Sequence, residues 1–190
     1  MLELCNVLNI SLSELFTFED TTLSQSSIYN PFTTNKLYLY YYTDNKLITS
    51  IIDIYAENNI YKCKFFNGIK NVQYYKKCSY YYEGFLESNR TSAYFTLKNA
   101  SPRNDMLEKV EIVVNIHWSN ELNVCKGLIL GLTPNSLPIV KKVILSPYEI
   151  LNIAEYNNDL TFSKEDVKKI FFDGALILEN KNYDEFFFDF

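Results

Sequence analysis

Residue types that carry out catalysis and metal binding are scarce in this chain. His117 is the only histidine, and it stands next to Trp118 in an expected strand, where a lone histidine is more often structural or exposed than catalytic. The four cysteines lie far apart without a CxxC pair, so we expect free, buried thiols. A cysteine nucleophile would need a histidine base, and only one histidine is available. We therefore expect no metal, no cofactor and no catalytic site, and we predict that the protein is not an enzyme.

Sequence motifs with a defined chemistry are also missing. The chain contains no GxGxxG, GxxxxGK[ST], HExxH or GxSxG pattern. It has no run of 18 apolar residues, so no membrane-spanning helix is expected, and residues 1–5 lack the basic start of a signal peptide. The net charge of -5 argues against an extended nucleic-acid surface, which would normally be basic. These absences predict a cytoplasmic protein without a membrane partner.

What the chain does have is a succession of short segments with apolar residues at every second position. Val110, Ile112 and Val114, for example, alternate with Glu111 and Asn115. Successive side chains of a strand point to opposite faces, so this pattern indicates half-buried antiparallel strands. The expected strands span residues 36–42, 47–56, 60–66, 80–86, 92–98, 107–118, 124–132 and 138–145. Eight short strands without long helices between them predict an antiparallel meander that forms a barrel or a sandwich.

Only five glycines are present, so most turns must be formed by other residues. Asp44-Asn45 and Asn58-Asn59 separate the first three strands, and Asn and Asp tolerate the left-handed backbone of tight turns. The segment 127–132 is apolar on both faces, which predicts a central strand. Its two glycines, Gly127 and Gly131, leave room for a bulge, a bend or close packing.

The fold class we predict is mainly β, with short helices only near the two ends of the chain. Residues 17–34 read as a linker, residues 35–146 as the β domain, and residues 147–190 as a helical C-terminal cap that ends in an acidic aromatic tail. A helix is expected at 148–156. A second begins after Ser163, because Asp166 three residues later completes a capping box. The segment 72–77 has no clear assignment.

The first sixteen residues resemble a known family. Leu8-Asn9-Ile10-Ser11, followed by Glu14-Leu15-Phe16, is similar to the end of a Cro/C1-type (Xre-like) helix-turn-helix domain. In that family the DNA-reading helix lies upstream of this segment. The resemblance therefore implies a regulatory ancestry, while residues 1–16 are expected to be a remnant without an element for the major groove. A plain helical hairpin would show a similar pattern. The chain would be a fragment, the product of an internal start, or a relative that has lost DNA binding.

Three further segments resemble the sensor-like regions that follow the helix-turn-helix in some bacterial regulators. They are Tyr82-Glu83-Gly84-Phe85-Leu86, Gly127-Leu128-Ile129-Leu130-Gly131 and the segment 138–146. The resemblance implies a companion domain that binds a small-molecule or peptide effector or forms a homodimer, with DNA contacted only through the missing helix-turn-helix. The alternative is a stand-alone protein-interaction module with no DNA role, whose contact is the tail 183–190.

Aromatic strand faces supply the candidate binding residues. Tyrosine combines a flat apolar ring with a hydroxyl group, which suits a pocket for a small ligand or a peptide. We expect a barrel mouth or cleft lined by such rings; the alternative is that the tyrosines form the core and rim of the sheet. The candidates are Tyr40, Tyr42, Tyr80, Tyr82, Tyr94, His117 and Trp118.

Overall fold

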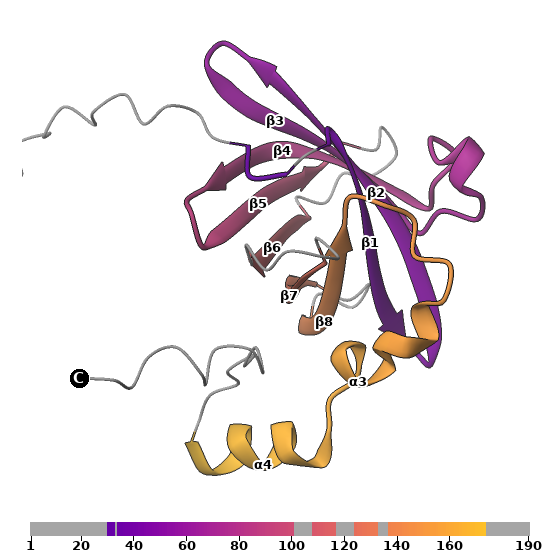
Figure 1. The fold of residues 1–190 in the computed structure, drawn as a ribbon, viewed down its shortest axis with the longest axis vertical. Coiled ribbons are helices and arrows are strands. Elements are labelled where there is room, and N and C mark those ends of the chain that lie inside the picture. Colours follow the sequence, from indigo (N-terminus) through magenta and orange to yellow (C-terminus); the bar gives the residue numbers. More distant parts are fainter. Residues whose placement is uncertain (1–29, 33, 101–107, 117–123, 133–136, 174–190) are drawn as a thin grey trace, which may run out of the picture.

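The protein folds into a closed antiparallel barrel of eight strands, as seen in a computed structural model that describes residues 30–32, 34–100, 108–116, 124–132 and 137–173 (Figure 1). Each strand pairs with the next along the chain, and β8 returns to pair with β1, with Leu39 opposite Leu145. The strands are β1 (Lys36–Thr43), β2 (Lys46–Glu57), β3 (Ile60–Asn67), β4 (Tyr80–Ser88), β5 (Ser92–Asn99), β6 (Lys109–Asn115), β7 (Cys125–Leu132) and β8 (Pro138–Ser146). The predicted meander is confirmed, and of the two predicted forms the chain adopts the barrel.

The barrel interior is filled by the alternate residues of each strand. On β1, Leu37, Leu39 and Tyr41 point inward, and on β6 Val110, Ile112 and Val114 do the same. All of these side chains are buried in one contiguous core. Near the start of β1, Phe32 packs against this core, and its ring stacks on Phe95 with the centroids 6.0 Å apart. The period-two pattern of the sequence therefore becomes an inside and an outside because the sheet closes.

Tight turns without glycine join the first three strands, as predicted. Asp44 and Asn45 have φ values of 48° and 60°, and Asn58 and Asn59 have values of 50° and 62°. Two successive left-handed residues form the hairpin turn whose twist matches that of the flanking strands. Asn and Asp accept this backbone more readily than other residues with a side chain.

Two inward-facing glycines allow neighbouring strands to approach closely. A Cβ atom on Gly84 of β4 would lie 1.9 Å from the carbonyl oxygen of Thr96, and one on Gly127 of β7 would lie 2.1 Å from that of Val113. Glycine at such positions lets the strands of a small barrel bend. The prediction of close packing is thus confirmed at Gly127. It does not extend to Gly131, where an added Cβ would have only ordinary contacts.

The C-terminal segment runs over the outside of the barrel and contains the 3-10 helix η2 (Ile153–Tyr156) and the helices α3 (Asn157–Leu160) and α4 (Lys164–Asp173). The predicted helix at 148–156 is wrong in its first half. There the backbone N–H of Tyr148 donates to the Ser146 hydroxyl, and that of Ile150 donates to the Tyr40 hydroxyl. These side-chain contacts replace the bonds of a helical turn. The unassigned segment 72–77 contains a short 3-10 helix, η1 (Val72–Tyr74).

Several expectations concern residues outside the described ranges. These include the helix-turn-helix remnant 1–16, nearly all of the linker, the tail 183–190, and the last residues of the expected strand 107–118, whose described part is β6. Of the cysteines that the structure describes, Cys63 and Cys125 are buried and Cys78 is half-buried, and Cys63 and Cys78 are free thiols. Within the described ranges, no helix has the length and apolar character needed to cross a membrane.

Candidate binding site at one end of the barrel

One end of the barrel interior is polar, in contrast to the apolar middle. It is formed where β1, β3, β5 and β7 end and β2, β4, β6 and β8 begin, so eight strand ends supply it. We call this region the polar end. Its polar inward-facing residues, each separated by an even number of positions from core residues of the same strand, are Tyr41, Thr43, Ser50, Asn67, Tyr80, Tyr82, Asn99, Glu108 and Lys141. Positions in the same phase at this end also carry the exposed Lys46, the apolar Ile48 and Ile139, and Gly131.

A buried tyrosine and a carboxylate form the first polar group. The Tyr82 hydroxyl donates to Oε1 of Glu108 over 2.9 Å, and the Asn99 side-chain amide donates to Oε2 over 3.0 Å. Burial raises the pKa of Tyr82, and the hydrogen bond to Glu108 and its negative charge raise it further. Tyr82 therefore remains a neutral donor at ordinary pH, and it holds the Glu108 carboxylate in one orientation.

A second polar group lies around Asn67 at the end of β3. The Oδ1 atom of Asn67 accepts hydrogen bonds from the Tyr41 hydroxyl over 2.7 Å and from the Ser50 hydroxyl over 2.9 Å. The backbone N–H of Gly68 donates to the same Ser50 oxygen over 3.3 Å. Burial raises the pKa of Tyr41; the Asn67 contact lowers it by a smaller amount, and the nearby Tyr80 raises it. Three strands are thereby joined by side chains inside the polar end.

Lys141 brings a positive charge into the polar end from β8. It occupies an inward position, two residues before the buried Val143. Its amine donates to the Thr43 hydroxyl and lies 5.1 Å from the centroid of the Tyr41 ring. Burial lowers the pKa of Lys141, and the negative charge of Asp44 opposes that effect. Among the described residues, no carboxylate lies within ion-pair distance of this amine.

Of the predicted binding residues that the structure describes, two lie together at this end, Tyr80 and Tyr82. Tyr82 lies in the core, and Tyr80, two positions earlier on the same face, is 46% exposed at the rim. The two side chains are neighbours because residues two positions apart on a strand share a face. His117 and Trp118 lie outside the described residues.

The other predicted tyrosines point to the outside of the barrel. Tyr94 is 43% exposed on β5. Tyr40 and Tyr42 lie beneath the C-terminal segment, where the Tyr40 hydroxyl accepts from the backbone of Ile150 and the Tyr42 hydroxyl donates to Asn157. The described tyrosines therefore do not line a single site. Odd-numbered and even-numbered tyrosines of β1 face opposite sides because the strand period is two.

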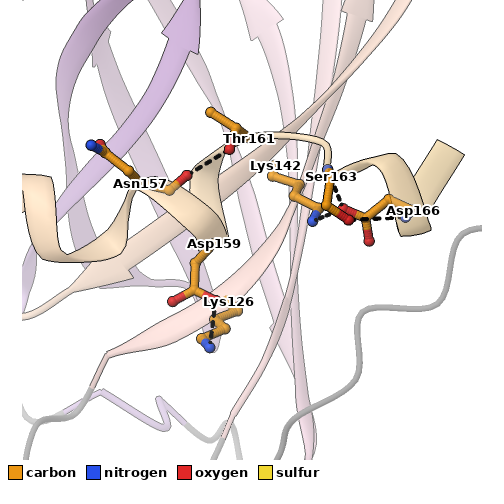
Figure 2. Close-up of polar contacts among 7 residues, drawn as sticks. All are labelled: Lys126, Lys142, Asn157, Asp159, Thr161, Ser163 and Asp166. Carbon is orange, nitrogen blue, oxygen red and sulfur yellow. Dashed lines mark hydrogen bonds and ion pairs between the residues drawn. The ribbon is translucent and has the colours of Figure 1, made fainter.

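Two ion pairs hold the C-terminal segment against the outer face of β7 and β8 (Figure 2). Lys126 meets Asp159 of α3 at 2.7 Å, and Lys142 meets Asp166 of α4 at 2.6 Å. Asp166 also accepts from the backbone N–H of Ser163 and donates its own backbone N–H to the Ser163 hydroxyl, which confirms the predicted capping box. The cap is thus attached to the strand that carries Lys141, but on the opposite face.

Sequence reasoning did not identify Lys141, Glu108 or Asn67 as candidates. The signal for Lys141 was present, because it stands in phase with the apolar Val143 and Leu145, and the structure places both in the core. An inward lysine is unusual, and that position alone marks it. Glu108 and Asn67 gave no comparable signal, since both stand at strand ends, where polar residues are ordinary.

Comparisons with known proteins found no matching family model, no similar curated protein and no similar solved structure.

Proposed function

We propose that this barrel is the effector-binding domain of a regulatory protein and that it binds a small molecule at the polar end. The observation that carries the proposal is the inward cluster of Lys141, Glu108, Tyr41 and Tyr82 at one end of an otherwise apolar interior. Barrels of eight strands either fill with side chains or hold one small ligand. A ring of hydrogen-bonding side chains inside such a barrel is the composition that fixes a ligand in a pocket.

Stability alone does not favour this arrangement. An inward lysine and an inward carboxylate lose hydration, and apolar side chains of similar volume would fill the same space without that cost. The opposite end shows that this chain can close a barrel with apolar groups, since Phe32 packs there on the core. Polar residues retained where apolar ones would serve are typical of a binding site.

The regulatory part of the proposal is supported by the resemblance of residues 1–16 to the end of an Xre-like helix-turn-helix domain. Binding of an effector by the barrel would then change the state of a partner or of a second copy. Contact with DNA would be made through a complete helix-turn-helix domain. Such a role would place the protein in the cytoplasm.

A metabolite screen by thermal shift tests the proposal. A ligand of the polar end should raise the melting temperature of the wild-type protein but not of Gly131→Leu, whose added side chain would enter the polar end from β7. The first atom of the new side chain has room, because the nearest heavy atom to a Cβ there is 3.5 Å away. The melting temperature of the variant without ligand shows whether the longer side chain is accepted. Absence of any stabilising compound, or hits that stabilise both proteins equally, would count against a ligand at this end.

A protein-interaction role is the second candidate, and α4 favours it. Phe171 and Phe172 are 83% and 78% exposed, and their rings contact each other edge to face with centroids 5.6 Å apart. A two-fold axis places the same patch of two chains in contact, so a second copy of this chain is the partner we propose. Sedimentation of the wild type and of the double variant Phe171→Ser, Phe172→Ser tests this, and a wild-type monomer at all concentrations would reject it.

A further inference from the structure

We infer that the polar end binds a small organic acid, with its anionic group at Lys141 and a hydrogen-bond donor, such as an ammonium group, at the opposite pole formed by Glu108. This inference rests on the proposed function and specifies the ligand class. It follows from three features of the polar end: a cation without an ion-pair partner among the described residues, a fixed carboxylate with spare acceptor capacity, and a position on β7 that carries no side chain.

The amine of Lys141 is held but not neutralised. Its described contacts are the uncharged Thr43 hydroxyl and the face of the Tyr41 ring, and the charge of Asp44 acts on it from beyond ion-pair distance. Burial disfavours its charged form, so an anion placed beside it would recover part of the lost hydration. The two neighbours also fix the direction of the lysine chain, which lowers the entropy cost of binding. A carboxylate or a phosphate group has the charge and the acceptor atoms that this amine requires.

Glu108 forms the pole of opposite charge. Its two oxygens accept one hydrogen bond each, from Tyr82 and from Asn99. A carboxylate has about four acceptor sites, so two remain for a ligand. Among the described residues, no lysine or arginine lies within ion-pair distance of this carboxylate. A protonated amine or another donor of the ligand would complete its contacts.

Gly131 stands on β7, between the strand that begins after Glu108 and the strand that carries Lys141. It occupies an inward position, in phase with the buried Ile129. Neither of the other two inward glycines is comparable, because at both of them an added Cβ would collide with backbone. At Gly131 the nearest atom would be Cγ2 of Val110 at 3.5 Å. The wall between the two charged poles therefore carries no side chain at position 131, where the inward Val110 and Ile129 flank it.

Two other ligand classes fit the polar end less well. A metal ion would need several carboxylate, histidine or cysteine ligands, and the described residues contain no group of three or more that could hold one. A nucleic acid would need a basic surface, whereas the chain has a net charge of -5 and the polar end contributes Lys141 and, at its exposed rim, Lys46. One cation and one anion facing the same interior favour a small zwitterion or a hydroxy acid.

The test is a titration of the full chain by NMR with matched probes: 4-aminobutyrate and 6-aminohexanoate, which carry both charges, and butyrate and n-butylamine, which carry one each. We expect at least one of the amino acids to bind more tightly than both single-charge probes. Lys141→Met should weaken the binding of butyrate and of the two amino acids at least tenfold. The control Lys98→Met, at an exposed outward position on β5, should leave all four affinities unchanged.

A second variant separates the two poles. Glu108→Gln keeps an acceptor for Tyr82 but removes the charge. It should therefore weaken the binding of the two amino acids and leave the affinity for butyrate unchanged. Equal effects of Lys141→Met and Lys98→Met, or a preference for n-butylamine, would overturn the inference. If no probe binds but the metabolite screen yields a compound sensitive to Gly131→Leu, the ligand class is wrong and the proposed function stands. If neither experiment detects binding, both fail.

Discussion

At the scale of single residues, the glycines of this barrel differ sharply in what they tolerate. Gly84→Ala would place a Cβ 1.9 Å from the carbonyl oxygen of Thr96, and Gly127→Ala would place one 2.1 Å from that of Val113. Because backbone rather than a mobile side chain is in the way, we expect each variant to lose about 3 kcal/mol or more of unfolding free energy. Urea denaturation measures this loss.

Gly131→Ala is the matched control, since its Cβ would have ordinary contacts. Replacing glycine where the backbone permits it restricts the unfolded chain, so we expect a change between zero and a gain of about 1 kcal/mol. A loss at Gly131 as large as that at Gly84 would mean that the strands do not approach as described.

Tyr82 should contribute to stability through its hydroxyl as well as its ring. Tyr82→Phe leaves Oε1 of Glu108 without its donor in a half-buried site, and we expect a loss of about 1–3 kcal/mol in unfolding free energy. Tyr80→Phe, at the exposed rim of the same strand, should change it by less than about 0.5 kcal/mol. Equal values for the two variants in chemical denaturation would contradict the buried contact with Glu108.

At the scale of elements, α4 depends on the ion pair between Lys142 and Asp166. Their side chains are 8% and 17% exposed, against 51% and 48% for the pair Lys109–Glu111 on β6. Asp166→Asn leaves the buried ammonium of Lys142 without its counter-charge. In a structure that cannot relax, this loss costs about 3–5 kcal/mol of unfolding free energy. Detachment of α4 would rehydrate Lys142, so we expect local loss of the helix rather than unfolding of the barrel.

Hydrogen exchange measures this directly, as faster exchange of the α4 amides with unchanged protection in the strands. Glu111→Gln, which breaks the exposed pair, should change neither the exchange rate of the α4 amides nor the protection of the strands.

The attachment of α4 should also depend on pH. Burial raises the pKa of Asp166, but the contacts with Lys142 and Ser163 outweigh it and lower the pKa below the ordinary 3.8. The attachment is therefore complete above pH 4 and is lost as the pH falls, whereas in Asp166→Asn protection should not vary in that range.

At the scale of the whole molecule, the buried tyrosines predict sensitivity to alkali. Burial raises the pKa of Tyr82 and Tyr41 above the ordinary value of 10.0. The folded state then keeps protons that the unfolded state loses, so the unfolding free energy should fall as the pH rises above about 10. Denaturation curves at several alkaline pH values measure the slope. The slope should be shallower in Tyr82→Phe than in the wild type, and identical slopes in the two proteins would contradict the raised pKa of Tyr82.

Much of the fold could be predicted because it depends on local patterns. Alternation located all eight strands, usually to within two residues, and Asp44-Asn45 and Asn58-Asn59 identified two hairpin turns through the backbone they tolerate. The capping box at Ser163 and Asp166 is equally local. The error at residues 148–150 had a non-local cause, since their N–H groups contact Ser146 and the distant Tyr40. The candidate site was less predictable, because Tyr40 and Tyr82 looked alike in the sequence.

By itself, the sequence determined that this is a mainly β protein of eight strands with a capped C-terminal helix, since period, turn chemistry and capping act over a few residues. Only the tertiary structure decided that the sheet closes, because the pairing of β8 with β1 joins the two ends of the meander. Closure also decides which tyrosines face inward and places Lys141 and Glu108 at the same end. These side chains meet only when distant strands are in register, which no local pattern encodes.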